Sequence, residues 1–175
     1  MVFFAVYNSP VGPIVIESDG QAITSLRFSN EQACDTSTAQ EKAGEEANTT
    51  IPIIAETLRW LDDYFTGKQT ENAVMLKKDA LNQKNVARII VRHKGTAFQQ
   101  RVWQALLTIP YGETVSYGEL ARMVGCKSAQ AVGQAVGANP IALLIPCHRV
   151  VGANGTLGGY AYGLNRKKQL LELEK

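Results

Sequence analysis

The residues best suited to chemistry are Cys147 and His148, which are adjacent in the run NPIALLIPCHRVV. The apolar stretch Ile141–Ile145 is expected to be buried and Pro146 ends it, so the cysteine follows a segment that a core can hold. A lone cysteine is more often an inert buried side chain than a nucleophile. Here a histidine and an arginine are its neighbours, and positive charge lowers the pKa of a thiol. The pattern therefore favours a nucleophilic cysteine with a depressed pKa.

The segment after this pair is expected to shape the surroundings of the thiol. Residues 151–163 read VGANGTLGGYAYG, a Gly-rich loop able to form a pocket. Neighbouring side chains of a chain often point apart. His148 is therefore expected to act on Cys147 through a bridging water, or not at all.

Three short helices are predicted before the cysteine. Thr96 can cap the first, and Pro110–Gly112 ends it. Residues 116–124 and 128–138 are predicted as two more, with a turn at 125–127, which is a helix-turn-helix pattern. The apolar stripe of the first helix comprises Phe98, Val102 and Leu106. By itself this pattern is weak evidence of DNA binding, because two short helices joined by a Gly turn are common in α-rich domains.

The predicted helix 128–138 is made almost entirely of small residues, including two glycines. Each Gly within a helix costs about 1 kcal/mol relative to Ala, so the composition needs a reason. Tight packing against another helix is one reason, and the helix taken alone favours it. The other is entry into a narrow groove, such as the DNA minor groove, about 6 Å wide.

The N-terminal half predicts a sheet and a helix. Residues 2–28 read as strands, with a hairpin turn at Asp19-Gly20. Residues 29–50 are polar and small, which favours a loop or a disordered insert. Residues 52–66 predict a helix that begins at a Pro and faces the core with Ile54, Leu58, Leu61 and Phe65. Residues 68–95 are expected to form a basic linker that contains a β-like run at 86–92.

Together these elements predict an α/β N-terminal domain, residues 1–90, plus a mainly α C-terminal domain with a helix-turn-helix, residues 91–175. Charge divides the chain in a similar way. Residues 1–76 carry 4 Lys/Arg against 11 Asp/Glu, a net −7, whereas residues 77–175 carry 14 against 5, a net +9. A basic half indicates a polyanionic partner, although chance clustering of surface charge explains it equally well.

Composition also narrows the cellular setting. The chain of 175 residues is 45% hydrophobic and 19% charged, which is typical of globular proteins. No apolar run approaches the roughly 20 residues that span a membrane, and the N-terminus does not read as a signal peptide. Three cysteines do not indicate a secreted disulfide framework. We therefore expect a cytoplasmic protein with no membrane contact.

Residues 96–174 resemble the catalytic domain of the O6-alkylguanine-DNA alkyltransferases, also called methylated-DNA–protein-cysteine methyltransferases. The resemblance is carried, in order, by TAFQQRVWQALLTIPYGETVSYGELA, AVGQAVGANP, IPCHRVV and GTLGGYAYGLNRKKQLLELE. The Pro-Cys-His-Arg-Val pentad is highly specific in that setting. SPVGPIVIE and LRWLDDYFTGK resemble the first domain of the family more loosely.

The resemblance implies a DNA-repair reaction at a flipped-out base. Cys147, as thiolate, takes the alkyl group from O6-alkylguanine in double-stranded DNA. His148 removes the thiol proton through a water, and Glu174 orients that histidine. Tyr117 hydrogen-bonds the guanine ring and helps neutralise the leaving base, and Asn139 ties the helix-turn-helix to the pocket. The thioether product has no leaving route, so each molecule acts once.

The resemblance also implies two sets of binding residues, with helix 128–138 in the minor groove. The expected DNA contacts are Tyr117, Gln130, Ala129, Ala131, Gly133 and Arg149. The expected pocket residues are Val150, Tyr160, Ala161, Tyr162 and Ala142, with the main chain of Val150 and Cys147 accepting from the guanine amino group. No cofactor and no metal are implied, and a monomer is expected. The four-ligand zinc site of some relatives is not apparent, because Cys34 lies in the polar stretch and no histidine precedes His93.

Several positions depart from the family pattern. Gln130 stands where an arginine usually fills the gap left by the flipped base, and the turn before it is one residue short. Ala161 replaces a frequent serine, which removes a hydroxyl but leaves the backbone N–H. Ala142 replaces a proline and Tyr162 a glycine found in some relatives, and both changes are expected to disfavour bulky adducts. The departures bear on DNA binding and adduct size more than on the transfer step.

Three other functions fit parts of the sequence. A non-catalytic module that binds DNA lesions would keep the fold but lack the cysteine, which is present here as Cys147. A cysteine–histidine hydrolase would need turnover and an oxyanion hole, which the Gly-rich loop does not identify. A sensor that activates transcription generally needs a further domain, for which 175 residues leave little room.

Overall fold

A computed structural model of the chain describes residues 1–29, 50–68, 74–76 and 89–175. The chain divides into two compact units, Met1–His93 and Lys94–Lys175. The prediction for 29–50 falls almost entirely outside the described residues. In the described part, no helix is both long and apolar enough to cross a membrane.

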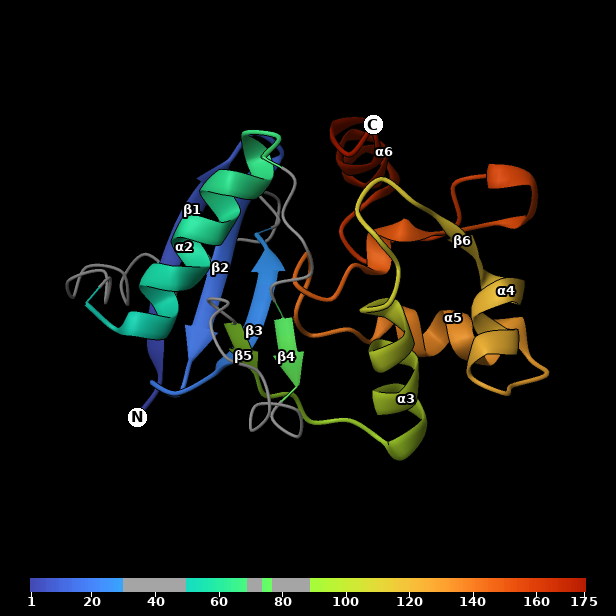
Figure 1. Cartoon of the computed structure of the whole chain (residues 1–175), viewed down its shortest axis with the longest axis horizontal. Coiled ribbons are helices and arrows are strands. Elements are labelled where there is room, and N and C mark those ends of the chain that lie inside the picture. Colours follow the sequence, from blue (N-terminus) through green and yellow to red (C-terminus); the bar gives the residue numbers. More distant parts are fainter. Residues whose placement is uncertain (30–49, 69–73, 77–88) are drawn as a thin grey trace. The chain divides into compact units, whose positions relative to one another are not determined.

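The N-terminal unit is a five-stranded sheet with one helix across a face (Figure 1). The order of strands is β1-β2-β3-β5-β4, in which β1 to β3 run antiparallel and β5 runs parallel to both its neighbours. Their bounds are β1 Phe3–Ser9, β2 Gly12–Ser18, β3 Ile23–Phe28, β4 Val74–Leu76 and β5 Ile89–Val91. The last two lie within the segment 68–95 that was expected to be a linker. β5 falls within the β-like run predicted at 86–92. β4 was not predicted, because a strand of three residues carries too little periodicity to be read without its partner in the sheet.

The predicted hairpin at Asp19-Gly20 is confirmed, because Ser18 pairs with Ile23 across the turn. Asp19 Oδ1 accepts hydrogen bonds from the backbone N–H groups of Gln21 and Ala22, at 3.0 and 2.9 Å. An aspartate that bonds the backbone two or three residues on is a common way to fix a turn. The turn thus sets the register in which β2 and β3 pair and bury Ile14, Ile16 and Leu26.

The helix predicted at 52–66 is α2, Pro52–Phe65, and its proline occupies the first turn. Its buried face differs slightly from the predicted stripe. Tyr64 and Thr57 are fully buried with Ile54 and Leu61, whereas Leu58 and Phe65 lie half-buried at the edge. The Thr57 hydroxyl can be buried because it donates to the Ile53 carbonyl at 2.7 Å.

The C-terminal unit is mainly helical, as predicted. Its helices are α3 Ala97–Leu106, α4 Tyr117–Met123, α5 Ala129–Gly137 and α6 Leu164–Leu173. The remaining elements are a two-stranded parallel pair, β6 Val115–Ser116 with β7 Val150–Val151, and two short turns of 3-10 helix, η1 Cys147–Arg149 and η2 Ala153–Gly155. Thr96 and Ser116 each form a capping box, which explains where α3 and α4 begin.

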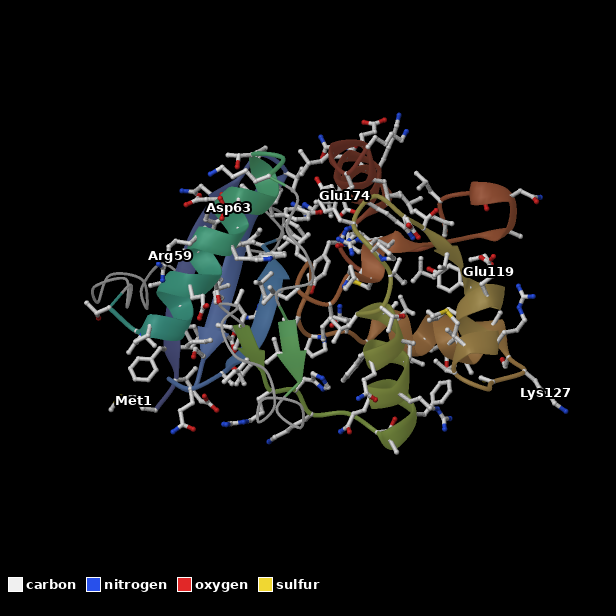
Figure 2. The ribbon with its side chains drawn as sticks, in the orientation of Figure 1. Met1, Arg59, Asp63, Glu119, Lys127 and Glu174 are labelled. Atoms are coloured by element: carbon white, nitrogen blue, oxygen red, sulfur yellow. The ribbon has the colours of Figure 1, made fainter. Side chains whose placement is uncertain are left out.

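The core of this unit lies between α3, α4 and α5 and the run that leads to the cysteine. Trp103 of α3 is almost fully buried, and its indole Nε1 donates to the Ala135 carbonyl of α5 at 2.8 Å. Val132 and Val136 of α5 are buried on the same side. Helix α5 is therefore held firmly by its inner face. Lys127, in the turn that precedes α5, points outward from the helices (Figure 2).

The small residues of α5 are not all explained by packing. A side chain at Gly133 would meet the Tyr117 ring at an ordinary 3.6 Å, but one at Gly137 would meet nothing within 4 Å. Ala129, Gln130 and Gln134 are also exposed. The outer face of α5 is thus slim and open, which packing alone does not require.

Candidate functional site

Cys147 is held at the end of a strongly constrained buried run. Leu143 has a positive φ of 64°, and the next amide, Leu144 N, donates to the Ala142 carbonyl at 2.7 Å, which makes a three-residue turn. The Asn139 side chain braces this run, because its Oδ1 accepts from Ile141 N at 3.0 Å and its Nδ2 donates to the Ile145 carbonyl at 2.8 Å. An asparagine at the end of α5 therefore fixes the backbone that presents the thiol.

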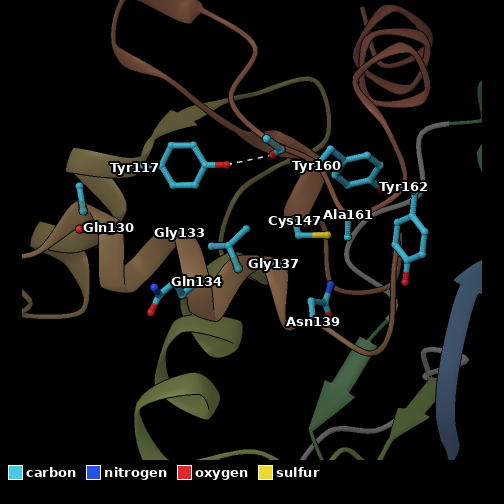
Figure 3. Close-up of a pocket in the computed structure, with 13 residues that line it drawn as sticks. Tyr117, Gln130, Gly133, Gln134, Gly137, Asn139, Cys147, Tyr160, Ala161 and Tyr162 are labelled. Atoms are coloured by element: carbon cyan, nitrogen blue, oxygen red, sulfur yellow. Dashed lines mark hydrogen bonds between the residues drawn. The ribbon is translucent and has the colours of Figure 1, made fainter.

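The cysteine lies against a pocket of about 620 Å³. The pocket lies between α5 and the Gly-rich segment, with the Cys147 sulfur at its wall and Tyr117 and Tyr162 at opposite ends (Figure 3). It is lined by Tyr117, Ala129, Gln130, Gly133, Gln134, Val136, Gly137, Asn139, Cys147, Gly159, Tyr160, Ala161 and Tyr162. A volume of this size suits a small organic molecule or a single nucleobase, because ligand pockets run to about 300–1,000 Å³.

Tyr117 has its hydroxyl beside the Gly-rich segment. It donates to the Gly159 carbonyl at 3.2 Å, and burial raises its pKa, to which the charge of Cys147 adds. A side chain at Gly158 would lie 2.7 Å from the Tyr117 ring, so only glycine permits this close approach. The phenol is therefore protonated at neutral pH, and its one proton is engaged with the Gly159 carbonyl.

The thiol of Cys147 does not have the depressed pKa that its basic neighbours predicted. The residue is only 5% exposed, and burial raises its pKa. Hydrogen bonding from Asn139 and the charge of Lys167 lower the pKa but do not offset burial. The prediction was wrong because desolvation of a thiolate outweighs nearby charge in so closed a position. A buried protonated thiol needs a base to become a nucleophile.

The next residue in the chain, His148, is a buried imidazole with a carboxylate partner. His148 Nε2 lies 2.8 Å from Glu174 Oε1, and both side chains are almost inaccessible to solvent. Burial raises the pKa of Glu174, but hydrogen bonds from His148 and Arg149, with the charge of Arg149, lower it to about 2. An ionised carboxylate can only accept hydrogen bonds, so Nε2 carries the proton. Burial lowers the pKa of His148, which keeps the ring neutral and leaves Nδ1 as its basic nitrogen.

Lys167 is a site residue that the sequence analysis missed. It is fully buried, and its Nζ donates to the carbonyls of Val150, Gly158 and Gly159 at 2.6, 3.3 and 3.4 Å. Its charge favours the thiolate of Cys147. The available signal was its spacing, because Lys167 is three residues from buried Leu170 and seven from Glu174, on one face of α6.

The structure gathers nine of the predicted site residues around one pocket. They are Tyr117, Ala129, Gln130, Gly133, Asn139, Cys147, Tyr160, Ala161 and Tyr162. His148 and Glu174 are buried together outside the pocket lining. Ala131 is half-buried in the first turn of α5, where its N–H donates to the Ser128 hydroxyl at 3.1 Å, and it does not line the pocket. The lining residues Gln134, Val136, Gly137 and Gly159 were not predicted.

Three predicted contacts need correction. Arg149 was expected at the DNA, but its side chain is 4% exposed and its guanidinium is bonded to Glu174 and the Ile109 carbonyl. Ala142 was expected in the pocket, but it is fully buried in the core and does not line it. Val150 does not line the pocket either, and its carbonyl accepts from Lys167. In each case the direction of the side chain or carbonyl depends on the turn at 143–149, which the sequence pattern does not reveal.

Two family models match the chain. The DNA-binding domain of 6-O-methylguanine DNA methyltransferase matches residues 97–175, and the ribonuclease-like domain of the same protein matches residues 2–77. The two matches fall in the two compact units, and together they cover most of the sequence.

Individual relatives are similar over almost the whole chain. The methylated-DNA–protein-cysteine methyltransferase of Mycobacterium leprae is 46% identical, over 96% of this chain and 89% of its own. The crystal structure of the Mycobacterium tuberculosis O6-methylguanine methyltransferase is 43% identical, with a TM-score of 0.77 over 100% of this chain and 93% of that one. A structure of the M. tuberculosis protein in complex with DNA is 40% identical, with a TM-score of 0.74 over 99% and 92% of the two chains. On this agreement of fold, site and sequence, the chain belongs to the 6-O-methylguanine DNA methyltransferase family.

Proposed function

We propose that this protein repairs DNA by moving an alkyl group from the O6 atom of guanine to Cys147, once per molecule. The single observation that carries the proposal is the position of the thiol. It lies at the wall of a base-sized pocket, and the next residue in the chain is a buried histidine whose basic nitrogen is set by a carboxylate. Membership of the family, whose relatives are named for this transfer, supports the same reaction.

The transfer can be written with all atoms accounted for. The Cys147 proton passes through a water to His148 Nδ1, and the thiolate attacks the alkyl carbon from the side opposite O6. A carbon–sulfur bond forms while the carbon–O6 bond breaks, and its electrons stay on the guanine. The Tyr117 hydroxyl turns its one proton from the Gly159 carbonyl to the guanine ring, where it helps neutralise the leaving base. The reaction needs no cofactor, because the thiol supplies both electrons of the new bond.

The DNA-binding part of the proposal rests on α5. Its exposed face is small enough to enter a minor groove, about 6 Å wide, and it forms one side of the pocket. Gln130 lies on that face and lines the pocket mouth, where it is placed to contact the partner of a base that has left the stack. Tyr117, Ala129 and Gly133 line the same side. The structure of a relative in complex with DNA supports DNA as the partner.

The experiment is intact-mass analysis after incubation with a duplex oligonucleotide that contains O6-methylguanine. One methyl group per protein is expected, and peptide mapping should place it on Cys147. The Cys147→Ala variant should bind the duplex and gain no mass. Cys126→Ala is the matched control, because this second cysteine is partly exposed in the turn before α5. A methyl group on Cys126, or product released beyond one equivalent, would overturn the proposal.

The same experiment separates the other functions considered. A lesion-binding module would hold the duplex without gaining mass, and a cysteine–histidine hydrolase would release product repeatedly. We further propose that the protein acts as a monomer and in the cytoplasm. Sedimentation equilibrium with and without the duplex, and fractionation of cells, test these two statements.

A further inference from the structure

The Glu174 carboxylate is held by four hydrogen bonds, of which an arginine supplies two. Its Oε1 accepts from His148 Nε2 at 2.8 Å and from Arg149 Nη2 at 3.1 Å. Its Oε2 accepts from Arg149 Nε at 2.9 Å and from the Gly112 amide at 3.2 Å. A carboxylate offers about four acceptor sites, so these donors fill them. The planar fork of Arg149 fixes the plane of the carboxylate, which a single donor could not do.

Arg149 itself is fixed from two further sides. Its Nη1 donates to the Ile109 carbonyl at 2.7 Å, and its guanidinium carbon lies 5.7 Å from the centre of the Tyr111 ring. The Tyr111 hydroxyl in turn donates to the Leu173 carbonyl at 3.2 Å, one residue before the glutamate. The loop after α3 therefore contacts both Arg149 and the end of α6, and it holds the two in place relative to each other.

Gly112 adds a further contact between this loop and Glu174 at the end of α6. Its φ is +78°, and a side chain there would lie 2.7 Å from the Glu174 carbonyl oxygen. Only a residue without a side chain lets the loop approach the end of α6 closely enough for its amide to reach Glu174 Oε2. These contacts, from buried Arg149 to exposed Gly112, together set the direction of the carboxylate.

We propose that Arg149 is a positioning residue, whose two-point hold on Glu174 aims Oε1 at His148 Nε2 and so reserves Nδ1 for the thiol proton. The effect of Arg149 on the transfer rate rests on the proposed function. The hydrogen bonds that hold Glu174 do not depend on that function. Arg149 touches neither the pocket nor the thiol, so it acts only through the other two residues.

The charges around His148 determine what loss of the arginine does. Burial lowers the pKa of His148, Glu174 raises it, and the positive charges of Arg149 and Lys167 lower it. Without Arg149 the full charge of Glu174 acts on the ring and raises its pKa. A histidine protonated on both nitrogens cannot accept the Cys147 proton, so the low-pH limb of the transfer rate moves to higher pH.

The decisive measurement is NMR titration of ¹⁵N-labelled histidine, with the transfer rate followed in parallel. The chain has only two histidines, so a His93→Gln variant assigns the signals. In Arg149→Met the His148 pKa and the low-pH limb of the rate should both rise by about one pH unit or more, as expected on unmasking a carboxylate nearby. In Arg149→Met/Glu174→Gln that rise should disappear, because the charge that causes it is gone.

Two further variants separate the proposed effect from misfolding and from the general loss of a positive charge. Arg149→Met leaves a buried carboxylate without its partner and can fail to fold. Arg149→Lys keeps the charge but reaches only one oxygen, so the His148 Nε2–H signal should move and transfer should slow about tenfold at every pH. Arg27→Met is the matched control, since Arg27 pairs with Glu17 at 2.8 Å on the surface of the N-terminal unit. It should change neither the titration nor the rate.

Failure of this inference differs from failure of the proposed function. The histidine titration needs no DNA, so it tests the arginine even if the wild-type protein accepts no methyl group. Unchanged His148 signals in both Arg149→Lys and Arg149→Met would overturn the inference. Absence of a mass increase in the wild-type protein would overturn only the function.

Discussion

Replacing Glu174 by glutamine should destabilise the C-terminal unit in a pH-dependent way. The carboxyl is almost fully buried, and its pKa is lowered from 4.5 to about 2. A difference of about 2.5 units, at roughly 1.4 kcal/mol each, corresponds to about 3 kcal/mol of stabilisation at pH 7. The value agrees with the 3–5 kcal/mol expected on breaking a buried ion pair, here the pair with Arg149 at 2.9 Å.

The sign of the pH dependence follows from the lowered pKa. The folded protein holds Glu174 ionised to lower pH than the unfolded chain does, so the contribution is fully present above pH 4.5 and declines as the pH falls towards 2. The free energy of unfolding of Glu174→Gln should therefore lie about 3 kcal/mol below that of the wild type at pH 7. The two values should converge between pH 4.5 and pH 2.

The assay is urea unfolding at several pH values, followed by tryptophan fluorescence. A Trp60→Phe background leaves Trp103, which is buried in the C-terminal unit, as the reporter. Lys168→Gln is a suitable control, because Lys168 makes only a long surface pair with Glu172 at 3.9 Å. A stability difference that stayed constant from pH 7 to pH 3 would refute the reasoning, since the loss would then come from packing and not from charge.

Four further outcomes are expected from the site. His148→Ala should slow methyl transfer by about 10²–10⁴-fold in single-turnover assays at pH 7, the usual loss for a general base, and a wild-type rate would exclude it from the step. Gln130→Arg should tighten duplex binding and steepen its salt dependence by about one unit of slope, as titrations at two salt concentrations would reveal. Tyr162→Gly should speed inactivation by free O6-benzylguanine about 10–200-fold, because Tyr162 lines the pocket and packs edge-on against Tyr160 at 5.5 Å; equal rates would mean that it does not limit adduct size. Lys167→Met should raise the pKa of the Cys147 thiol, measured as the pH dependence of thiol alkylation, because it removes a charge that favours the thiolate.

The sequence alone determined the local features of this protein. The starts of two helices were readable, because Thr96 has a side chain that satisfies free N–H groups and a proline begins α2. The Asp19-Gly20 turn was readable because its residue types suit a hairpin. The nucleophile was readable because Cys147 follows a buried run and stands in the Pro-Cys-His-Arg-Val pentad. All of these depend on residues close together in the chain.

Tertiary structure decided what depends on distant residues. β4 is three residues long, and it becomes a strand only because β5 provides a partner. The thiol pKa followed from burial, which no neighbour in sequence reports. Arg149 lies in the same short turn as Cys147, yet its side chain points inward because Glu174, 25 residues away, is the carboxylate within its reach. In the sequence, Lys167 is indistinguishable from the surface lysines around it. Only the packing of α6 brings its ammonium within hydrogen-bond distance of three carbonyls. Charge and burial act through space, so the direction of a side chain, and with it the role of a residue, is set only when the chain has folded.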